Sequence, residues 1–233
     1  MSIFLDTGNV AEIQQFHRMG IIRGVTTNPT ILLKDGVAGG TRGMERRLKE
    51  IAKLIAPLPV SVEVTTTERE AVIQQARTFA GWADNIIVKV TIHGPDGELE
   101  NLEIVHELVA EHHIRVNVTA MMSAQQCLLA SMAGATYLSI FGGRVNNMGY
   151  DARAEIAKLR KVLDQLHLPG QILVGSTREV LNVIEWLEAG AHIVTATPDI
   201  LRGMIVHPYS KETVQQFLRD AAQAEAISAV GVT

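Results

Sequence analysis

The sequence has a single cysteine, no surplus of positive charge and no long apolar run, and each shortage excludes a class of protein. Cys127 alone cannot build a disulfide framework or a cysteine-rich metal site. The 21 Lys and Arg residues are outnumbered by 25 Asp and Glu residues, so no basic field favours nucleic acid or an anionic membrane. No apolar run approaches the ~20 residues that span a bilayer.

The N-terminal segment does not have the pattern of a signal peptide. It has no basic residue near its start, and Asp6 interrupts its only apolar stretch. Hydrophobic residues make up 47% of the 233 residues and charged residues 20%, a balance typical of a compact globular domain. We therefore expect a cytoplasmic globular protein with neither a membrane nor a nucleic-acid partner.

Short apolar runs recur along the chain, separated by longer segments with helical periodicity. Some runs are continuously apolar, as in Ile86–Val88, which is typical of parallel strands covered by helices. The runs that predict strands are Ile3–Leu5, Gly24–Thr27, Val60–Val64, Ile86–Val90, Arg115–Val118, Tyr137–Phe141, Gln171–Val174 and His192–Thr195.

The intervening segments carry apolar residues at helical spacing. Residues 44–55 and 151–166 each place apolar side chains three or four residues apart. Thr67, followed three residues later by Glu70, has the spacing of a capping box. No stretch rich in glycine, serine or proline marks a linker, so we expect one domain over residues 1–233.

Eight strand–helix units in a chain of this length predict an α/β fold, a (β/α)8 TIM barrel. The rival interpretation is an open, doubly wound sheet, which usually has fewer strands. Its dinucleotide-binding form has no support, because no G-x-G-x-x-G motif follows the first predicted strand.

Polar residues at the carboxyl ends of the predicted strands are the candidate site residues, because the loops of a barrel converge there. In chain order they are Asp6, Thr26, Asn28, Glu63, Lys89, Asn117, Thr119, Arg144, Ser176 and Arg178.

Lys89 carries the most information, because it lies within the apolar run IIVKVTI. An ammonium buried without partners is costly and tends to lose its proton. A neutral amine in an enclosed site is the nucleophile that forms a Schiff base with a ketone. The alternative is a lysine that reaches solvent from a strand end, or one that pairs with Asp6 or Glu63.

Asp6 and Glu63 would supply the acid–base groups that Schiff-base chemistry needs near the lysine. The alternative is that both carboxylates merely neutralise Lys89. Arg144, Ser176 and Arg178 indicate an anion site, since Ser176 and Arg178 stand where a helix is expected to begin. Helix capping and surface charge would explain these three residues equally well.

The eight histidines show no H-x-x-x-H pair with a carboxylate on one helix face. We therefore expect no metal site, and no pattern calls for a cofactor.

Several motifs, taken together and in this order, resemble the transaldolase family, in its short branch that includes fructose-6-phosphate aldolase. They are LDTGN at 5–9, GVTTNPT at 24–30, VSVEV at 60–64, IIVKV at 86–90, NVTAMMSAQQ at 117–126, GGR at 142–144 and GSTRE at 175–179. The resemblance spans nearly the whole chain, and GVTTNP and VKV are its specific parts.

The resemblance implies a (β/α)8 barrel that forms a Schiff base through Lys89. It further implies that Asp6 holds hydroxyls of a dihydroxyacetone unit and assists C–C cleavage, and that Glu63 and Thr119 position a catalytic water. Thr26, Asn28 and Asn117 would line the sugar site. The anionic end of the substrate would be held by Arg144, Ser176 and Arg178.

The resemblance also implies a homo-oligomer of pentameric rings, often a decamer, assembled through a C-terminal helix at about 211–226. The substrates would be a ketose with an anionic C6 group, which is a phosphate or, as in 6-deoxy-6-sulfofructose, a sulfonate. The acceptor would be an aldehyde such as glyceraldehyde 3-phosphate.

Some positions depart from the family pattern. Transaldolases tend to have Phe, and fructose-6-phosphate aldolase Tyr, where this chain has Met122. Residues 91–97 replace a short proline loop, and Asn146-Asn147 replaces a more acidic stretch, which predicts an altered substrate rim and a less ordinary sugar.

Three alternatives to a transaldolase stay open at this point. They are a fructose-6-phosphate aldolase that cleaves without transfer, a phosphosugar isomerase that uses Glu63 as a non-covalent base, and a sugar-phosphate-binding barrel without catalysis.

Overall fold

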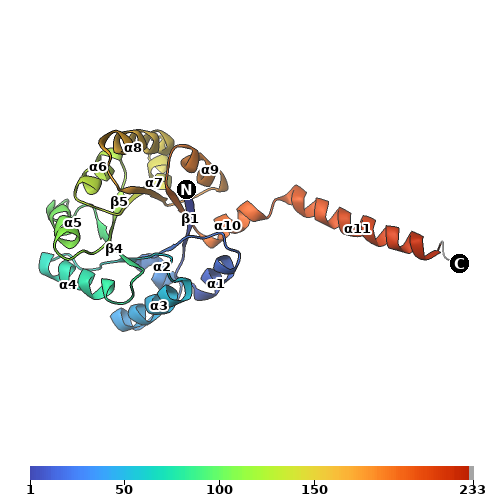
Figure 1. The fold of residues 1–233 in the computed structure, drawn as a ribbon, viewed down its shortest axis with the longest axis horizontal. Helices are drawn as coiled ribbons and strands as arrows, with labels where there is room; N and C mark the ends of the chain where they lie inside the picture. The colour runs from blue at the N-terminus through green and yellow to red at the C-terminus, as the bar shows by residue number, and fades with distance from the viewer. Residues whose placement is uncertain (231–233) are drawn as a thin grey trace.

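The computed structural model, which describes residues 1–230, contains parallel strands that close into a barrel in sequence order, β1 to β8 (Figure 1). The strands are β1 Ser2–Asp6, β2 Val25–Thr26, β3 Val60–Glu63, β4 Ile86–Thr91, β5 Val116–Met121, β6 Tyr137–Phe141, β7 Gln171–Gly175 and β8 Ile193–Ala196. The predicted (β/α)8 barrel with an additional C-terminal helix is thus confirmed.

Helices surround the ring of strands (Figure 1). They are α1 Val10–Arg18, α2 Pro29–Lys34, α3 Gly40–Ile55, α4 Arg69–Ala80, α5 Glu100–Ala110, α6 Ala124–Met132, α7 Gly142–Asn147, α8 Ala152–Leu166, α9 Val180–Glu188, α10 Pro198–Ile205 and α11 Pro208–Val230. Two short helices, α2 and α7, lie in the loops after β2 and β6 and were not predicted, because six residues are too few to show a helical period.

Most predicted boundaries agree with the structure to within one or two residues, and the exceptions have local causes. The helix predicted over 44–55 begins at Gly40, where two glycines with positive φ precede its first apolar turn. The capping box predicted at Thr67 is wrong. Helix α4 begins at Arg69 with Glu68 as its N-cap and no side-chain cap, so Thr67 lies one residue too early.

The barrel interior is apolar toward the amino ends of the strands and polar toward their carboxyl ends. Phe4, Ile87, Tyr137, Leu173 and Ile193 form a buried cluster inside the ring of strands, and the rings of Phe4 and Tyr137 meet edge to face at 5.9 Å between centroids. Burial of each such side chain stabilises the fold by roughly 1.5–3 kcal/mol. This apolar cluster, called the plug below, lies beneath the polar residues at the strand ends.

Above the plug, three strands exchange side-chain hydrogen bonds. Asn117 Nδ2 donates to Ser61 Oγ at 3.1 Å, and Ser139 Oγ donates to Asn117 Oδ1 at 2.7 Å. Because all three side chains are buried, these bonds satisfy polar groups that would otherwise be costly.

Helix α11 leaves the barrel and extends away from it (Figure 1), and residues 206–227 are all exposed. The helix is longer than the predicted 211–226 at both ends. Within the described chain no helix is both long enough and apolar enough to span a membrane.

Candidate active site

A cavity of about 740 Å³ opens at the carboxyl ends of the strands. Nearly all of the predicted site residues line it: Asp6, Thr26, Asn28, Glu63, Lys89, Thr119, Arg144, Ser176 and Arg178. The exception among the predicted residues is Asn117. Its amide is bonded to Ser61 and to Ser139, and Ser139 itself lines the cavity, so Asn117 supports the cavity wall through its neighbours.

Lys89 reaches the cavity from the middle of the barrel wall. The residue is 5% exposed, and its Nζ lies 2.9 Å from Glu63 Oε2 and donates to the carbonyl of Thr27 at 3.0 Å. Glu63 pairs with Lys89 in the β3–β4 register, which brings the two side chains together. Of the two carboxylates that were expected near the lysine, Glu63 is the one in direct contact.

Asp6 is held at the end of β1 by a short series of hydroxyl groups. Thr26 Oγ1 donates to Asp6 Oδ1 at 2.6 Å, and Thr195 Oγ1 lies 2.6 Å from the same threonine oxygen. Since the Thr26 proton is given to Asp6, Thr195 donates to Thr26. Thr195 also lines the cavity. It ends the predicted strand His192–Thr195, but it was not singled out from the sequence because it belongs to no motif.

The pKa of Asp6 is raised above its usual range, chiefly because burial in the barrel mouth disfavours the charged form. The hydrogen bond from Thr26 and the charge of Lys89 act in the opposite direction, while the negative charges of Asp35 and Glu63 add to the increase. Keeping the buried Asp6 carboxylate ionised at neutral pH therefore destabilises the folded state.

That cost predicts a pH-dependent stabilisation by Asp6→Asn. A carboxyl whose pKa is raised on folding stabilises the fold below its unfolded pKa, and this contribution is lost as pH rises through the folded pKa. The asparagine stays neutral throughout. We expect the Tm of Asp6→Asn to exceed that of the wild type at pH 8, with a gap that narrows toward pH 5, as measured by differential scanning fluorimetry. A variant less stable than the wild type at both pH values would contradict this account.

Thr119 lines the cavity beside an irregularity in β5. The β5–β6 register shifts between Val118 and Met121, and Ala120 has a φ of 60°, a region that residues other than glycine rarely adopt. Bulges of this kind often redirect a side chain next to a site. The buried Oγ1 of Thr119 has no hydrogen-bond partner among the described residues, so it is available to a water or a substrate.

Ser176 shows the same combination at the end of β7. Its φ is 61°, and its buried Oγ has no partner in the described part of the chain. Gly143 allows the backbone of Ser176 to pass close by, because a Cβ on Gly143 would lie 1.9 Å from the carbonyl oxygen of Ser176. A strained backbone of this kind costs about 1–3 kcal/mol and clusters at functional sites.

Arg144 and Arg178 stand at the cavity rim after β6 and β7. Both are exposed, and no acidic side chain among the described residues is in contact with either guanidinium. The guanidinium of Arg144 lies over the ring of Phe141, 5.1 Å from its centroid. Two cations that line the same cavity without an acidic partner favour an anionic ligand.

Two of the amides near the start of α9, which were expected to contribute to the anion site, have partners within the chain. Helix α9 begins at Val180, and the backbone amides of Arg178 and Glu179 both donate to Asn182 Oδ1. The capping box thus occupies the amides of Arg178 and Glu179. The side chains of Arg144, Ser176 and Arg178 line the cavity as potential donors.

The residues that were expected to alter the substrate rim do not line the cavity. Met122 packs against the hydrophobic core, and residues 91–97 and Asn146-Asn147 are also absent from the cavity wall. Asn146 instead accepts a hydrogen bond from the amide of Ala152, where α8 begins. The aromatic side chain that faces the cavity is Phe141.

Comparison with known proteins agrees with this geometry. The family model described as transaldolase/fructose-6-phosphate aldolase matches residues 3–232. The chain belongs to the transaldolase/fructose-6-phosphate aldolase family. Relatives include "probable transaldolase 2" of Listeria monocytogenes, 40% identical over 94% of this chain and 95% of the relative. A "probable transaldolase" of Shouchella clausii is 37% identical over 94% of this chain and 96% of the relative.

Solved structures support the barrel fold alone. A putative phosphonomutase from Burkholderia cenocepacia superimposes with a TM-score of 0.59 at 14% identity, covering 96% of this chain and 94% of that one. A thiamine phosphate pyrophosphorylase from Pyrococcus furiosus gives 0.58 at 13% identity, covering 84% and 85%. The chain is thus an enzyme of the transaldolase/aldolase class on a widely shared scaffold.

Proposed function

We propose that this enzyme is a Schiff-base transaldolase that cleaves a ketose with a C6 phosphate and transfers a dihydroxyacetone unit to an aldehyde such as glyceraldehyde 3-phosphate. The observation that carries the proposal is a buried lysine at the cavity floor whose amine touches a carboxylate. Lys89 Nζ lies 2.9 Å from Glu63 Oε2, so a proton acceptor is in place when the amine becomes a nucleophile.

The proposed sequence begins when Lys89 gives a proton to Glu63 and its neutral Nζ adds to the C2 carbonyl of the ketose. The resulting carbinolamine loses its hydroxyl as water, and an iminium forms. The C3–C4 bond then breaks as the C4 hydroxyl gives its proton to Asp6. The bonding electrons pass to the iminium nitrogen, which leaves an enamine on Lys89 and an aldehyde that departs.

The second half of the reaction reverses these steps with another aldehyde. The enamine attacks the acceptor carbonyl, Asp6 returns the proton to the new C4 oxygen, and water hydrolyses the imine. Glu63 and the unpartnered hydroxyl of Thr119 are suited to holding that water between them. Thr26 and Asn28, which also line the cavity, are left to contact the sugar hydroxyls.

The arginine pair supports phosphate in preference to sulfonate at C6. A phosphate carries about −1.5 to −2 charges near neutral pH, whereas a sulfonate carries −1. A site for sulfonate could leave one arginine paired with an acidic neighbour. Neither Arg144 nor Arg178 has such a neighbour within the described chain, so two cations are available to one dianion.

The aromatic side chain in the cavity supports transfer in preference to simple cleavage. The ring that lines the cavity is that of Phe141, and it offers no hydroxyl to a water that could protonate the enamine. A longer-lived enamine has time to meet an aldehyde acceptor.

Borohydride trapping tests the proposed function. The enzyme is incubated with fructose 6-phosphate and then with borohydride, and the modified peptide is identified by mass spectrometry. A dihydroxyacetone-sized adduct on Lys89, together with transfer to glyceraldehyde 3-phosphate, is the expected result. Isomerisation without any adduct would support the isomerase instead, and binding without turnover would support a non-catalytic barrel.

We further propose that α11 joins copies of the chain into a homo-oligomer, a pentameric ring or two stacked rings. Val214, Phe217 and Leu218 lie at helical spacing on α11, and each is more than half exposed. A second exposed apolar surface lies on α9, at Leu181 and Ile184. Exposed apolar groups on this scale mark interaction sites, and an unsupported helix gains most of its stability from such packing.

The double variant Phe217→Glu/Leu218→Glu is therefore expected to lower the oligomeric mass. Placing charge on the apolar stripe would leave it desolvated and unpaired in an interface, so light scattering after size-exclusion chromatography should report monomers near 25.4 kDa. Gln215→Glu, which adds one charge beside the stripe, serves as the matched control. An unchanged mass in the double variant would exclude α11 as the interface.

A further inference from the structure

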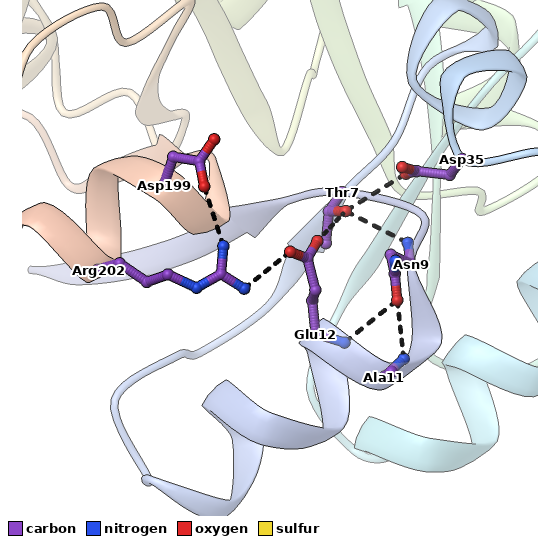
Figure 2. Close-up of polar contacts among 7 residues, drawn as sticks. All are labelled: Thr7, Asn9, Ala11, Glu12, Asp35, Asp199 and Arg202. Atoms are coloured by element: carbon purple, nitrogen blue, oxygen red, sulfur yellow. Dashed lines mark hydrogen bonds and ion pairs between the residues drawn. The ribbon is translucent and has the colours of Figure 1, made fainter.

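The turn that directly follows Asp6 is held by a carboxylate from another part of the barrel. The amide of Gly8 donates to Asp35 Oδ2 at 2.6 Å, and Thr7 Oγ1 lies 3.3 Å from the same oxygen. Asp35 is the C-cap residue of α2, after β2, so the contact joins the loops of two neighbouring strands. Figure 2 shows Asp35 and Thr7 pointing toward one another.

Two further contacts bind the same turn from other directions. Arg47 of α3 donates from Nη1 to the carbonyl of Gly8 at 2.8 Å. Thr7 Oγ1 also lies 3.2 Å from Glu12 Oε2, and Arg202 of α10 holds Glu12 by an ion pair of 2.9 Å (Figure 2). The Asp35–Gly8 bond is the shortest of these contacts and combines an ionised acceptor with a backbone donor, the stronger class of hydrogen bond.

Gly8 packs closely against the side chains at the end of α2. A Cβ at this position would lie 2.8 Å from Leu32 Cδ2 and 3.2 Å from Asp35 Oδ2. The backbone therefore passes directly over the end of α2. Asp6 is the last residue of β1, two residues before Gly8, so the path of this turn constrains the backbone that carries the Asp6 carboxyl, in addition to the hydrogen bond from Thr26.

We propose that Asp35 is a positioning residue, whose carboxylate fixes the β1–α1 turn and thereby keeps Asp6 in line with Lys89 for C–C cleavage. This inference rests on the proposed function for the role of Asp6. Asp35 itself lies at the cavity wall but acts through the backbone of Gly8, and no step of the reaction is assigned to it.

The charge of Asp35 also influences the protonation of Asp6. The groups that face Asp6 are Thr26, Lys89, Glu63 and Asp35, and the negative charge of Asp35 raises the pKa of Asp6. Because Asp6 must be ionised to take the C4 hydroxyl proton, removal of that charge should shift the acid limb of the pH–kcat profile to lower pH.

The experiment compares Asp35→Ala with Asp35→Asn. The alanine variant loses the acceptor for Gly8, and a displaced catalytic group should cost about 10- to 100-fold in kcat. The asparagine variant keeps an oxygen acceptor, so most of that loss should be recovered. The acid limb of the profile should shift in both variants. Asp164→Ala, which removes a surface carboxylate paired with Arg160 on α8, serves as the control and should change neither property.

Hydrogen exchange of the Gly8 amide adds a readout that needs no turnover. Exchange should be fast in Asp35→Ala and slow again in Asp35→Asn. If the wild type forms no borohydride adduct, the proposed function fails. The exchange pattern still tests whether Asp35 holds the β1–α1 turn. Wild-type kcat in Asp35→Ala, or equal losses in both variants with an unmoved acid limb, would overturn the positioning role.

Discussion

Lys89→Arg is expected to fold and to lose turnover by several orders of magnitude. A guanidinium is never deprotonated in a protein, so the variant cannot form the carbinolamine from which every later step proceeds. The arginine can still form an ion pair with Glu63 and donate to the Thr27 carbonyl, the two contacts that the lysine makes. The measurements are kcat with fructose 6-phosphate, borohydride trapping, and Tm to verify folding.

Lys34→Arg is the matched control for this experiment. Lys34 is an exposed lysine at the rim of the same cavity, so its replacement should leave the adduct on Lys89 in place. A folded Lys89→Arg enzyme that retains near-normal activity would exclude the covalent mechanism. The isomerase that uses Glu63 as its base would then become the better interpretation.

Removal of either rim arginine is expected to lower kcat/KM for a phosphorylated ketose by about 10- to 100-fold. A hydrogen bond to a charged group is worth roughly 1.5–3 kcal/mol, and every 1.4 kcal/mol is a factor of ten. Both guanidinium groups are solvent-exposed without substrate, so the loss should appear in KM more than in folding stability. The experiment measures Arg144→Ala and Arg178→Ala against fructose 6-phosphate.

The same variants separate phosphate from sulfonate specificity. Arg178→Ala should cost more with fructose 6-phosphate than with 6-deoxy-6-sulfofructose, because the dianion has more to lose from a missing cation. Arg153→Ala, which removes an exposed arginine of α8 paired with Glu185, is the control. If both rim variants change kcat/KM by only a few-fold with either ketose, the anion site lies elsewhere.

The strand pattern made the fold predictable, since parallel strands buried on both faces must be continuously apolar. Ile86–Val88 is such a run, and β4 was placed correctly from it. The positions at which these runs end then indicated Asp6, Glu63 and Lys89. The barrel brings strand ends together, so a list of polar residues after apolar runs becomes a list of cavity residues.

The strand pattern did not separate residues that line the cavity from residues that support it. Asn117 and Thr119 are both polar residues in β5, yet only Thr119 lines the cavity, because the amide of Asn117 is bonded to Ser61 and Ser139. Thr195 contacts Thr26 from β8, on the other side of β1, a contact between residues far apart in the chain. Met122, expected at the substrate rim, packs against the hydrophobic core instead.

The sequence by itself therefore determined the barrel, the family and the lysine, because burial periodicity and local motifs are carried by neighbouring residues. Only the tertiary structure decided which carboxylate touches the lysine, which aromatic ring faces the cavity, and that Asp35 grips the turn after Asp6. Those facts depend on contacts between separate loops at ångström precision. Such contacts follow from how the ring of strands closes, and no periodicity in the chain records them.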